Sequence, residues 1–192
     1  MLKNNFNIII TGVGGQGVVT LLSILDQAAL IEGNDVKSSE LHGLSQRGGS
    51  VETHVKFGEK VYSPLVFNGQ ADLIIGLEML EGLRAVYRAS AKTKFLVNDH
   101  FMPFIGSLTK EDISNKLKNN LKDKLFLVPA SEICTKELGN EVVSGIYLLG
   151  YASFNNLIPL RPESIERAIE KIVPGKYLEL NKKAFLLSKN GK

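Results

Sequence analysis

The chain contains one cysteine, Cys134, among 192 residues. A single thiol excludes an internal disulfide, and it also excludes a self-contained iron–sulfur cluster, which normally takes about four thiolates. We interpret Cys134 as a small buried residue of a helix rather than as a nucleophile. Any redox metal that the protein works with must therefore lie on another chain.

Long apolar runs are missing as well. No stretch approaches the roughly 20 apolar residues that a membrane span needs, and residues 1–7 lack the apolar segment of a secretory signal. We therefore expect a cytoplasmic protein that does not contact a membrane.

Strong charge and metal-binding motifs are also absent. The net charge of +3 is too small to indicate nucleic-acid binding, and we expect no nucleic-acid partner. There is no P-loop lysine pattern, no H-E-x-x-H and no Cys/His cluster at zinc spacing. We expect neither a catalytic residue nor a metal ligand in this chain.

What the sequence does contain is an alternation of strand-like and helix-like segments. This pattern, 44% hydrophobic residues and a length of 192 residues predict one α/β domain over residues 1–192. We expect a three-layer α/β/α, Rossmann-like fold whose sheet core spans about residues 6–129. Its sheet should be mostly parallel with an antiparallel hairpin, and residues 130–192 should form a helical C-terminal part.

The pattern also places individual elements. We expect strands at residues 6–11, 35–39, 72–77, 95–97 and 125–128, helices at 18–32, 78–90 and 109–122, and a hairpin between 51–57 and 61–64. Residues 142–152 are apolar nearly all round as a helix, so they are buried either in the core or in a subunit interface.

A glycine-rich turn, Gly-Val-Gly-Gly-Gln-Gly at residues 12–17, joins the first strand to the first helix. Gly12 would allow the tight turn, Gly14 would let phosphates approach the backbone, and Gly17 would permit close packing of helix on strand. The turn predicts a site for a phosphate or a carboxylate.

A second polar, glycine-rich loop occupies residues 40–49 and brings a carboxylate, an imidazole and a guanidinium together. We expect the two loops to form a cleft. The candidate binding residues are Gly12, Gly14, Gly15, Gln16, Gly17, Glu40, His42, Gly43, Gln46, Arg47, Gly48 and Gly49.

Several of these residues have a plainer interpretation. Arg47 could bind a phosphate through two hydrogen bonds, or it could form an ion pair with Glu40 that shapes the loop. His42 is at least as easily explained by a hydrogen bond to the backbone as by a role in proton transfer.

Other polar residues suggest no role. Glu78 and Glu81 follow a central strand and could face the crevice at its carboxyl end, but we favour the interpretation of a solvated pair in the first turn of a helix. His54 and His100 look like surface or loop residues.

An NAD-binding domain should carry an acidic residue at the end of its second strand. Asp35 stands at the start of that strand and Glu40 comes a few residues late. This spacing weakens the interpretation as a dinucleotide-binding protein.

Taken together, the two loops with Ser-Gln-Arg-Gly-Gly at residues 45–49, Ser63-Pro64, and Ala-Asp-Leu-Ile-Ile-Gly at residues 71–76 with Glu78 and Glu81 resemble the gamma domain of 2-oxoacid:ferredoxin oxidoreductases. The similarity is greatest to the beta subunit of the indolepyruvate branch. It extends from about residue 7 into the 142–155 segment.

The resemblance implies a subunit that is inactive alone. In this family a larger companion carries thiamine diphosphate and [4Fe-4S] clusters, and the complex converts a 2-oxoacid to an acyl-CoA while reducing ferredoxin. The gamma-type domain would help to bind coenzyme A with its glycine loops.

Two alternatives remain open from the sequence. One is a stand-alone oxidoreductase that binds NAD or FAD at residues 12–17. The other is a scaffold subunit whose loops contact no cofactor.

Overall fold

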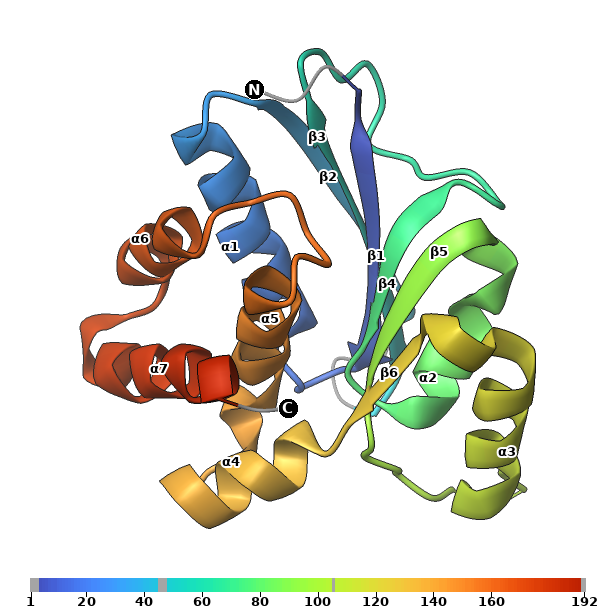
Figure 1. Ribbon diagram of the computed structural model, residues 1–192. Coiled ribbons are helices and arrows are strands. Elements are labelled where there is room, and N and C mark those ends of the chain that lie inside the picture. Colours follow the sequence, from blue (N-terminus) through green and yellow to red (C-terminus); the bar gives the residue numbers. More distant parts are fainter. Residues whose placement is uncertain (1–3, 45–47, 105, 191–192) are drawn as a thin grey trace.

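The computed structural model describes residues 4–44, 48–104 and 106–190. Six strands form one sheet in the order β2-β3-β1-β4-β5-β6, with helices on both faces (Figure 1). The strands are β1 (Phe6–Val13), β2 (Asp35–His42), β3 (Ser50–Gly58), β4 (Ala71–Gly76), β5 (Ala89–Asn98) and β6 (Leu125–Val128). The α-helices are α1 (Val18–Ile31), α2 (Met79–Arg84), α3 (Lys110–Leu121), α4 (Ala130–Leu138), α5 (Ser144–Phe154), α6 (Pro162–Ile172) and α7 (Gly175–Leu187). The described residues also include four 3₁₀ turns: η1 (Ala85–Arg88), η2 (Lys122–Lys124), η3 (Glu141–Val143) and η4 (Ser188–Asn190).

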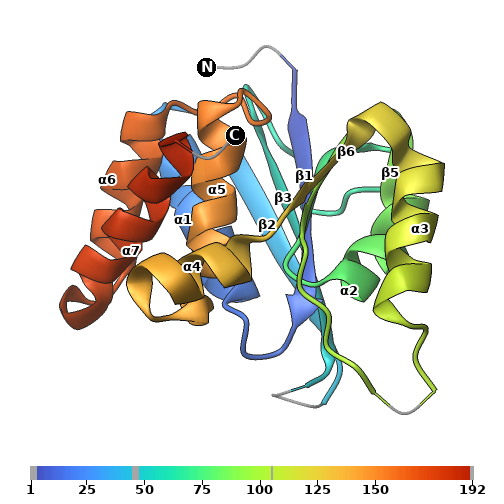
Figure 2. The ribbon, with the colours of Figure 1, turned by 60° about the horizontal axis from the view of Figure 1, so that its bottom comes forward.

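The helices form two layers that cover opposite faces of the sheet (Figure 2). One apolar core lies between the sheet and the helices α1, α4, α5, α6 and α7. A second, smaller core lies between the opposite face of the sheet and the helices α2 and α3. Ile8, Ile9 and Ile10 of β1 have no exposed surface, as a central strand covered on both faces requires. The predicted three-layer α/β fold with a helical C-terminal part is confirmed.

The sheet contains both parallel and antiparallel strand pairs, and the sequence predicts this arrangement only in part. The pairs β1–β4, β4–β5 and β5–β6 are parallel, whereas β3 is antiparallel to both β1 and β2. The expected hairpin between residues 51–57 and 61–64 is wrong, because residues 61–64 form an irregular loop. There the N–H of Val61 donates to Asp35 Oδ2 at 2.8 Å instead of pairing with β3. The hairpin is β2–β3, and the second glycine loop connects its strands.

The segment expected as one helix over residues 78–90 is shorter. Helix α2 ends at Arg84, a single 3₁₀ turn follows, and Ala89 already pairs with Ala71 of β4. Farther on, the predicted capping box of α3 is present, since Thr109 Oγ1 accepts from the N–H of Asp112 at 3.1 Å and the Asp112 carboxylate accepts from the N–H of Thr109.

The apolar segment at residues 142–152 forms η3 and most of α5, and it packs inside this chain. An added Cβ on Gly145 would lie 3.0 Å from Leu21 of α1, and one on Gly150 would lie 2.5 Å from the carbonyl oxygen of Phe185 in α7. The two glycines therefore let α1 and α7 approach α5 closely. Of the two expectations, burial in the core is confirmed.

Cys134 lies in α4 with no exposed surface. Burial raises the pKa of its thiol to about 11. Since the thiolate is the reactive form, this residue is inert at neutral pH, as the sequence predicts.

Candidate functional site

The candidate site lies at the carboxyl ends of β1 and β4. Helix α1 follows β1 onto one face of the sheet, and α2 follows β4 onto the opposite face (Figures 1 and 2). Between two such strands the connections diverge and leave a crevice, where open α/β sheets bind their ligands. Both glycine loops and Glu78 border this crevice.

The first glycine turn is held by its own hydrogen bonds and by the second loop. The N–H of Gly14 donates to Gly49 O at 2.8 Å, and the N–H of Gly48 donates to Gly14 O at 3.3 Å. Within the turn, Gln16 Oε1 accepts from the N–H of Val13 at 2.8 Å. The two predicted loops therefore form one backbone-bonded unit that continues the β1–β3 ladder.

The glycines of the first turn have different roles from those expected. An added Cβ on Gly12 would lie 3.1 Å from atoms of both Leu77 and Val18, so Gly12 provides the close packing. Gly15 and Gly17 have φ angles of 105° and 82°, and nothing lies within 4 Å of a Cβ added to either. They provide the left-handed turn, where residues with a Cβ are strained.

Helix α1 begins directly at this turn. Its N-cap is Gly17, which has no side chain to cap the helix, so the N–H groups of the first helical turn point outward without an intrahelical acceptor. These groups and the positive end of the helix dipole favour an anion. The residues present thus fit the phosphate or carboxylate predicted from the sequence.

A hollow of about 580 Å³ lies between the two loops. Its walls include the predicted residues Gly14, Gly15, Gly17, Glu40, His42 and Gly43, together with Val13, Val18, Val19, Leu44 and Val51. The structure therefore brings half of the candidate residues into one cleft. Whether they bind a ligand stays a prediction.

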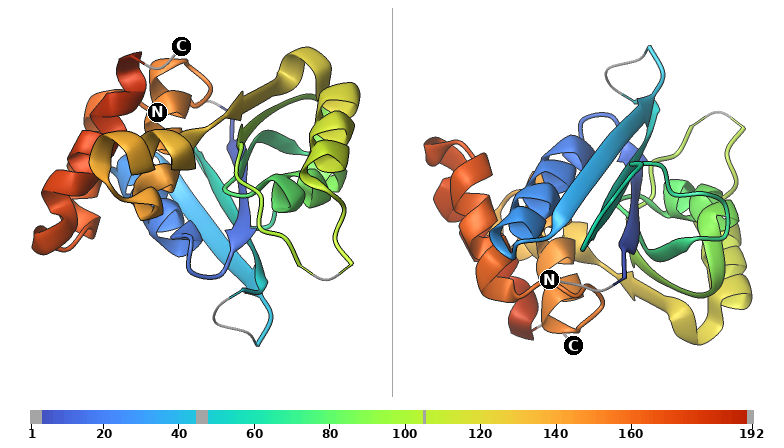
Figure 3. Two further views of the ribbon diagram at one scale, coloured as in Figure 1. Left: turned by 90° about the horizontal axis from the view of Figure 1, so that it is seen from below. Right: turned by 90° about the horizontal axis from the view of Figure 1, so that it is seen from above.

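Residues 40–44 and 48–49 of the second loop lie at the end of the β2–β3 hairpin, which extends beyond the other strands (Figure 3). Glu40 and His42 are exposed, and His42 Nδ1 lies 2.9 Å from the carbonyl oxygen of Gly43. This contact matches the plainer interpretation of His42. Gln46 and Arg47 lie outside the described residues, so their predicted roles are carried by the sequence alone.

The remaining candidates lie beside this cleft. Gln16 Nε2 lies 3.6 Å from Met102 Sδ, and its Oε1 is used by the turn itself. Gly48 borders a second hollow of about 440 Å³, next to the helix start of α2.

This second hollow is bordered by Glu78 and Glu81, and both side chains are buried. The expectation of a solvated pair is therefore wrong. Glu78 Oε2 accepts from the N–H of Glu81 at 2.9 Å, and Glu81 Oε1 lies 2.6 Å from Arg84 Nη1. The signal in the sequence was their position directly after an apolar central strand, which places them at the crevice.

Burial raises the pKa of the Glu78 carboxyl above its ordinary value of 4.5, although hydrogen bonds from the N–H groups of Glu81 and Met102 act in the opposite direction. Glu78 fixes the α2 start and the loop after β5. The start of α2 and the loop after β5, which both border the crevice, therefore donate hydrogen bonds to the same buried carboxylate.

His54 is also misjudged from the sequence, because its side chain is 1% exposed. Its Nδ1 accepts from the N–H of Val66 at 2.9 Å, and its Nε2 lies 3.0 Å from Glu52 Oε1. The same oxygen lies 2.8 Å from Arg88 Nη2. This cluster attaches the loop of residues 59–70 and η1 to β3, away from the glycine loops.

The strand order argues against dinucleotide binding of the usual kind. In such domains the second strand lies next to the first, so that its terminal acid reaches the ribose bound at the first loop. Here β3 separates β2 from β1. Glu40 therefore belongs to a protruding hairpin rather than to a strand beside the glycine turn.

Among residues 4–44, 48–104 and 106–190, no three His, Cys, Asp or Glu side chains gather in a way that could hold a metal ion. Within the same described ranges, every helix is too short or too polar to cross a membrane.

Residues 7–190 match the protein family described as pyruvate ferredoxin/flavodoxin oxidoreductase. The chain belongs to this family. The resemblance inferred from the glycine loops is confirmed, and the protein is a gamma-type subunit of a 2-oxoacid:ferredoxin oxidoreductase. It is one component of a multi-subunit complex.

Relatives within the family match nearly end to end. The chain is 35% identical to the indolepyruvate oxidoreductase subunit IorB of Thermococcus kodakarensis over 188 residues, which cover 95% of this chain and 93% of the relative. It is 31% identical to the common gamma subunit of the pyruvate/ketoisovalerate oxidoreductases of Pyrococcus abyssi over 175 residues, 90% of this chain and 89% of that subunit.

Solved structures show the same fold. A keto/oxoacid ferredoxin oxidoreductase gamma subunit from Geobacter sulfurreducens superposes with a TM-score of 0.71 at 22% identity, covering 96% of each chain. The 2-oxoglutarate:ferredoxin oxidoreductase from Magnetococcus marinus, solved with 2-oxoglutarate, coenzyme A and succinyl-CoA, gives a TM-score of 0.73 at 17% identity. That match covers 97% of this chain and 31% of the longer one.

Proposed function

We propose that this chain is the smaller subunit of an indolepyruvate-type 2-oxoacid:ferredoxin oxidoreductase that acts on aryl 2-oxoacids. The supporting observation is the nearly full-length match to IorB subunits at about one third identity. The complex would convert a 2-oxoacid, coenzyme A and two oxidised ferredoxins to an acyl-CoA, carbon dioxide, two reduced ferredoxins and a proton.

The companion is a larger subunit that carries thiamine diphosphate and iron–sulfur clusters, and ferredoxin docks on the complex through it. Those groups would supply the decarboxylation and the electron transfer. This chain would contribute binding and positioning, so we expect it to be inactive alone.

The cleft between the two glycine loops is the proposed contact for coenzyme A. The N–H groups at the start of α1 suit a phosphate oxygen, and the Arg47 guanidinium would add a charged partner. Glu40 on the same wall is a carboxylate and would be unfavourable directly beside a phosphate. The phosphates are therefore expected nearer to Gly15 and Gly17 than to Glu40.

The assembled complex should prefer aryl 2-oxoacids. Co-expressed with its companion, it is expected to reduce ferredoxin with indolepyruvate at a kcat/KM at least about tenfold above that with pyruvate or 2-oxoglutarate, a difference of about 1.4 kcal/mol. Coenzyme A-dependent ferredoxin reduction, followed anaerobically with each acid, measures this. A preference for pyruvate or 2-oxoglutarate would contradict the indolepyruvate assignment and leave the family membership intact.

Replacing Arg47 with alanine should raise the KM for coenzyme A about tenfold or more, since a hydrogen bond to a charged group contributes about 1.5–3 kcal/mol. The KM for the 2-oxoacid should stay unchanged. Arg161→Ala is the matched control, because Arg161 is 72% exposed and contacts Glu32 far from the cleft. Equal kinetics for both variants would remove the coenzyme A role from this loop and favour a scaffold subunit.

A further inference from the structure

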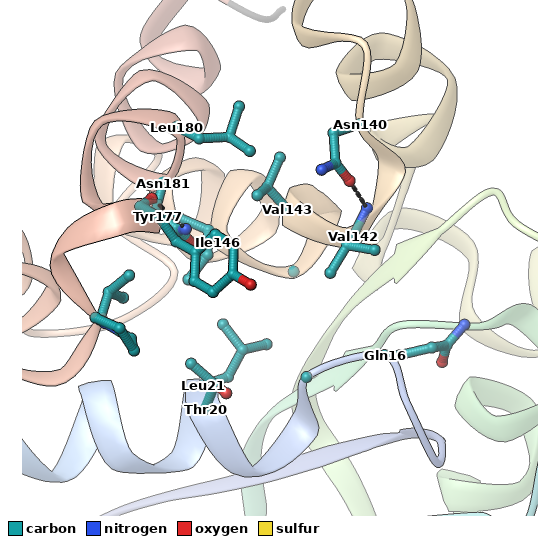
Figure 4. Close-up of a pocket in the computed structure, with 14 residues that line it drawn as sticks. Gln16, Thr20, Leu21, Asn140, Val142, Val143, Ile146, Tyr177, Leu180 and Asn181 are labelled. Atoms are coloured by element: carbon teal, nitrogen blue, oxygen red, sulfur yellow. Dashed lines mark hydrogen bonds between the residues drawn. The ribbon is translucent and has the colours of Figure 1, made fainter. Parts of the chain in front are cut away.

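A third hollow, of about 510 Å³, lies between the start of α1, the η3–α5 segment and α7 (Figure 4). Its volume is in the range of small-molecule sites. Leu21, Val142, Val143, Ile146, Val173 and Leu180 give it apolar walls. Gly17 borders both this hollow and the cleft between the glycine loops, so the two spaces adjoin at the start of α1.

The described side chains that line the hollow include no charged group. These side chains offer an ionised carboxylate or phosphate no charged partner, which is unfavourable where hydration is lost. We therefore expect the part of a ligand that enters among them to be uncharged. Phosphates and 2-oxoacid carboxylates would remain outside it.

One aromatic side chain faces this space. Figure 4 shows the ring of Tyr177 projecting into the hollow from α7, with Ile146 close to it, whereas the Gln16 side chain points away. Tyr177 is 49% exposed, and Lys176 Nζ lies 4.7 Å from the centroid of its ring. A planar ring in the hollow would stack on the face of Tyr177 that Lys176 does not cover.

Two amides supply a donor and an acceptor at the edge of the hollow. Asn140 uses its Oδ1 to accept from the N–H of Val142 at 3.0 Å, which leaves its Nδ2 as a donor. Asn181 uses its Nδ2 to donate to Tyr177 O at 2.8 Å, which leaves its Oδ1 as an acceptor. Adenine presents both a donor and an acceptor along one edge, as it does to asparagine in nucleic acids, whereas indole presents only an N–H donor, which suits Asn181 Oδ1.

From these observations we propose that the hollow binds an uncharged, nitrogen-containing aromatic ring, with Tyr177 against its face and Asn140 and Asn181 at its edge. Two molecules of the proposed reaction carry such a ring. One is coenzyme A with its adenine, and the other is the indole of an aryl 2-oxoacid or of its thioester. The choice between them rests on the proposed function, whereas the ring site itself does not.

Titration of the full-length chain with indole-3-acetamide, which has no charge, tests the site. The chain contains no tryptophan, so the indole fluorescence of the probe is free of that background. We expect a saturable shift to shorter wavelength as the ring enters the apolar space, with a Kd below about 1 mM. Adenosine should displace the probe.

Tyr177→Ala should weaken probe binding at least about fivefold, because it removes the aromatic face on which the ring stacks. The matched control is Tyr62→Ala. Tyr62 is 81% exposed and lies under Lys60 at 5.1 Å, much as Tyr177 lies under Lys176 at 4.7 Å, but it is remote from the hollow. If the chain saturates with neither probe, or if Tyr177→Ala binds them like the wild type, the ring site is refuted.

The assembled complex distinguishes the two sources of the ring. If adenine enters the hollow, Tyr177→Ala raises the KM for coenzyme A and leaves that for the 2-oxoacid unchanged; if indole enters, the reverse holds. A change in neither KM overturns the assignment to these molecules. A complex that oxidises no aryl 2-oxoacid contradicts the proposed function, but probe binding still tests the ring site.

Discussion

Replacing Glu52 with alanine should lower the free energy of unfolding by about 3 kcal/mol. Glu52 Oε1 contacts both His54 and Arg88, and the side chains of these three residues are at most 17% exposed. Removing the carboxylate leaves a largely buried guanidinium without its partner, and breaking such a pair costs about 3–5 kcal/mol when burial is complete. Urea unfolding at pH 7, compared with the wild type, measures the loss.

The same cluster predicts a dependence on pH. Burial alone would raise the pKa of Glu52, but its contacts with His54, Arg88 and Tyr87 outweigh burial and hold the pKa below its ordinary value of 4.5. The folded state therefore binds this proton more weakly than the unfolded state. The stabilisation is complete above about pH 4.5 and is lost as the pH falls through the folded pKa.

Stability curves of the wild type and Glu52→Gln should accordingly differ at pH 7 and converge in acid. Glu59→Gln is the control, because Glu59 is an exposed carboxylate in the loop that this cluster anchors. Its stability curve should follow that of the wild type throughout. A difference between the wild type and Glu52→Gln that stays constant down to pH 3 would argue against a lowered pKa.

Gly150→Ala should be the second strongly destabilising change, with an expected loss of about 2–3 kcal/mol. A Cβ at this position would lie 2.5 Å from Phe185 O and even closer to Ser188 Oγ. Overpacking of this kind costs about 1–3 kcal/mol, and the obstructing carbonyl is backbone, which moves only if α7 moves. Thermal unfolding of the purified chain measures the loss.

Gly175→Ala is the matched control for that change. Gly175 begins α7, and nothing lies within 4 Å of a Cβ built on it. The substitution should be neutral or stabilising by up to about 1 kcal/mol, because alanine restricts the unfolded chain. Equal melting temperatures for both variants would show that α5 and α7 are packed less closely than described.

The sequence predicted the elements that are encoded locally. The central strands β1 and β4 were evident from apolar runs, which are typical of strands covered by helices on both faces of a sheet. The start of α3 was evident from the capping box of Thr109 and Asp112. The meeting of the two glycine loops in one cleft was also foreseen. For the strands and the start of α3, a few neighbouring residues carry the whole signal.

The errors concern partners that are distant in the chain. Alternation in β3 indicates a strand with one polar side, but it does not reveal that β2 and β1 are its neighbours. His54 and Glu78 look solvated in the sequence because the N–H groups that donate to their side chains belong to Val66 and Met102, 12 and 24 residues further along the chain. The roles of Gly12 and Gly17 were exchanged because a glycine required by a close contact and a glycine required by a positive φ angle look the same in the sequence.

The two glycine loops are joined by hydrogen bonds between main-chain atoms, from the N–H of Gly14 to Gly49 O and from the N–H of Gly48 to Gly14 O. The distance between the first turn and the hairpin is therefore set independently of the side chains that the loops carry. Chemical selectivity at this end of the sheet can change by substitution while the spacing between the loops stays constant. Under the proposed coenzyme A role, chimeras that exchange only loop side chains between gamma-type subunits should change ligand preference while the spacing between the loops stays the same.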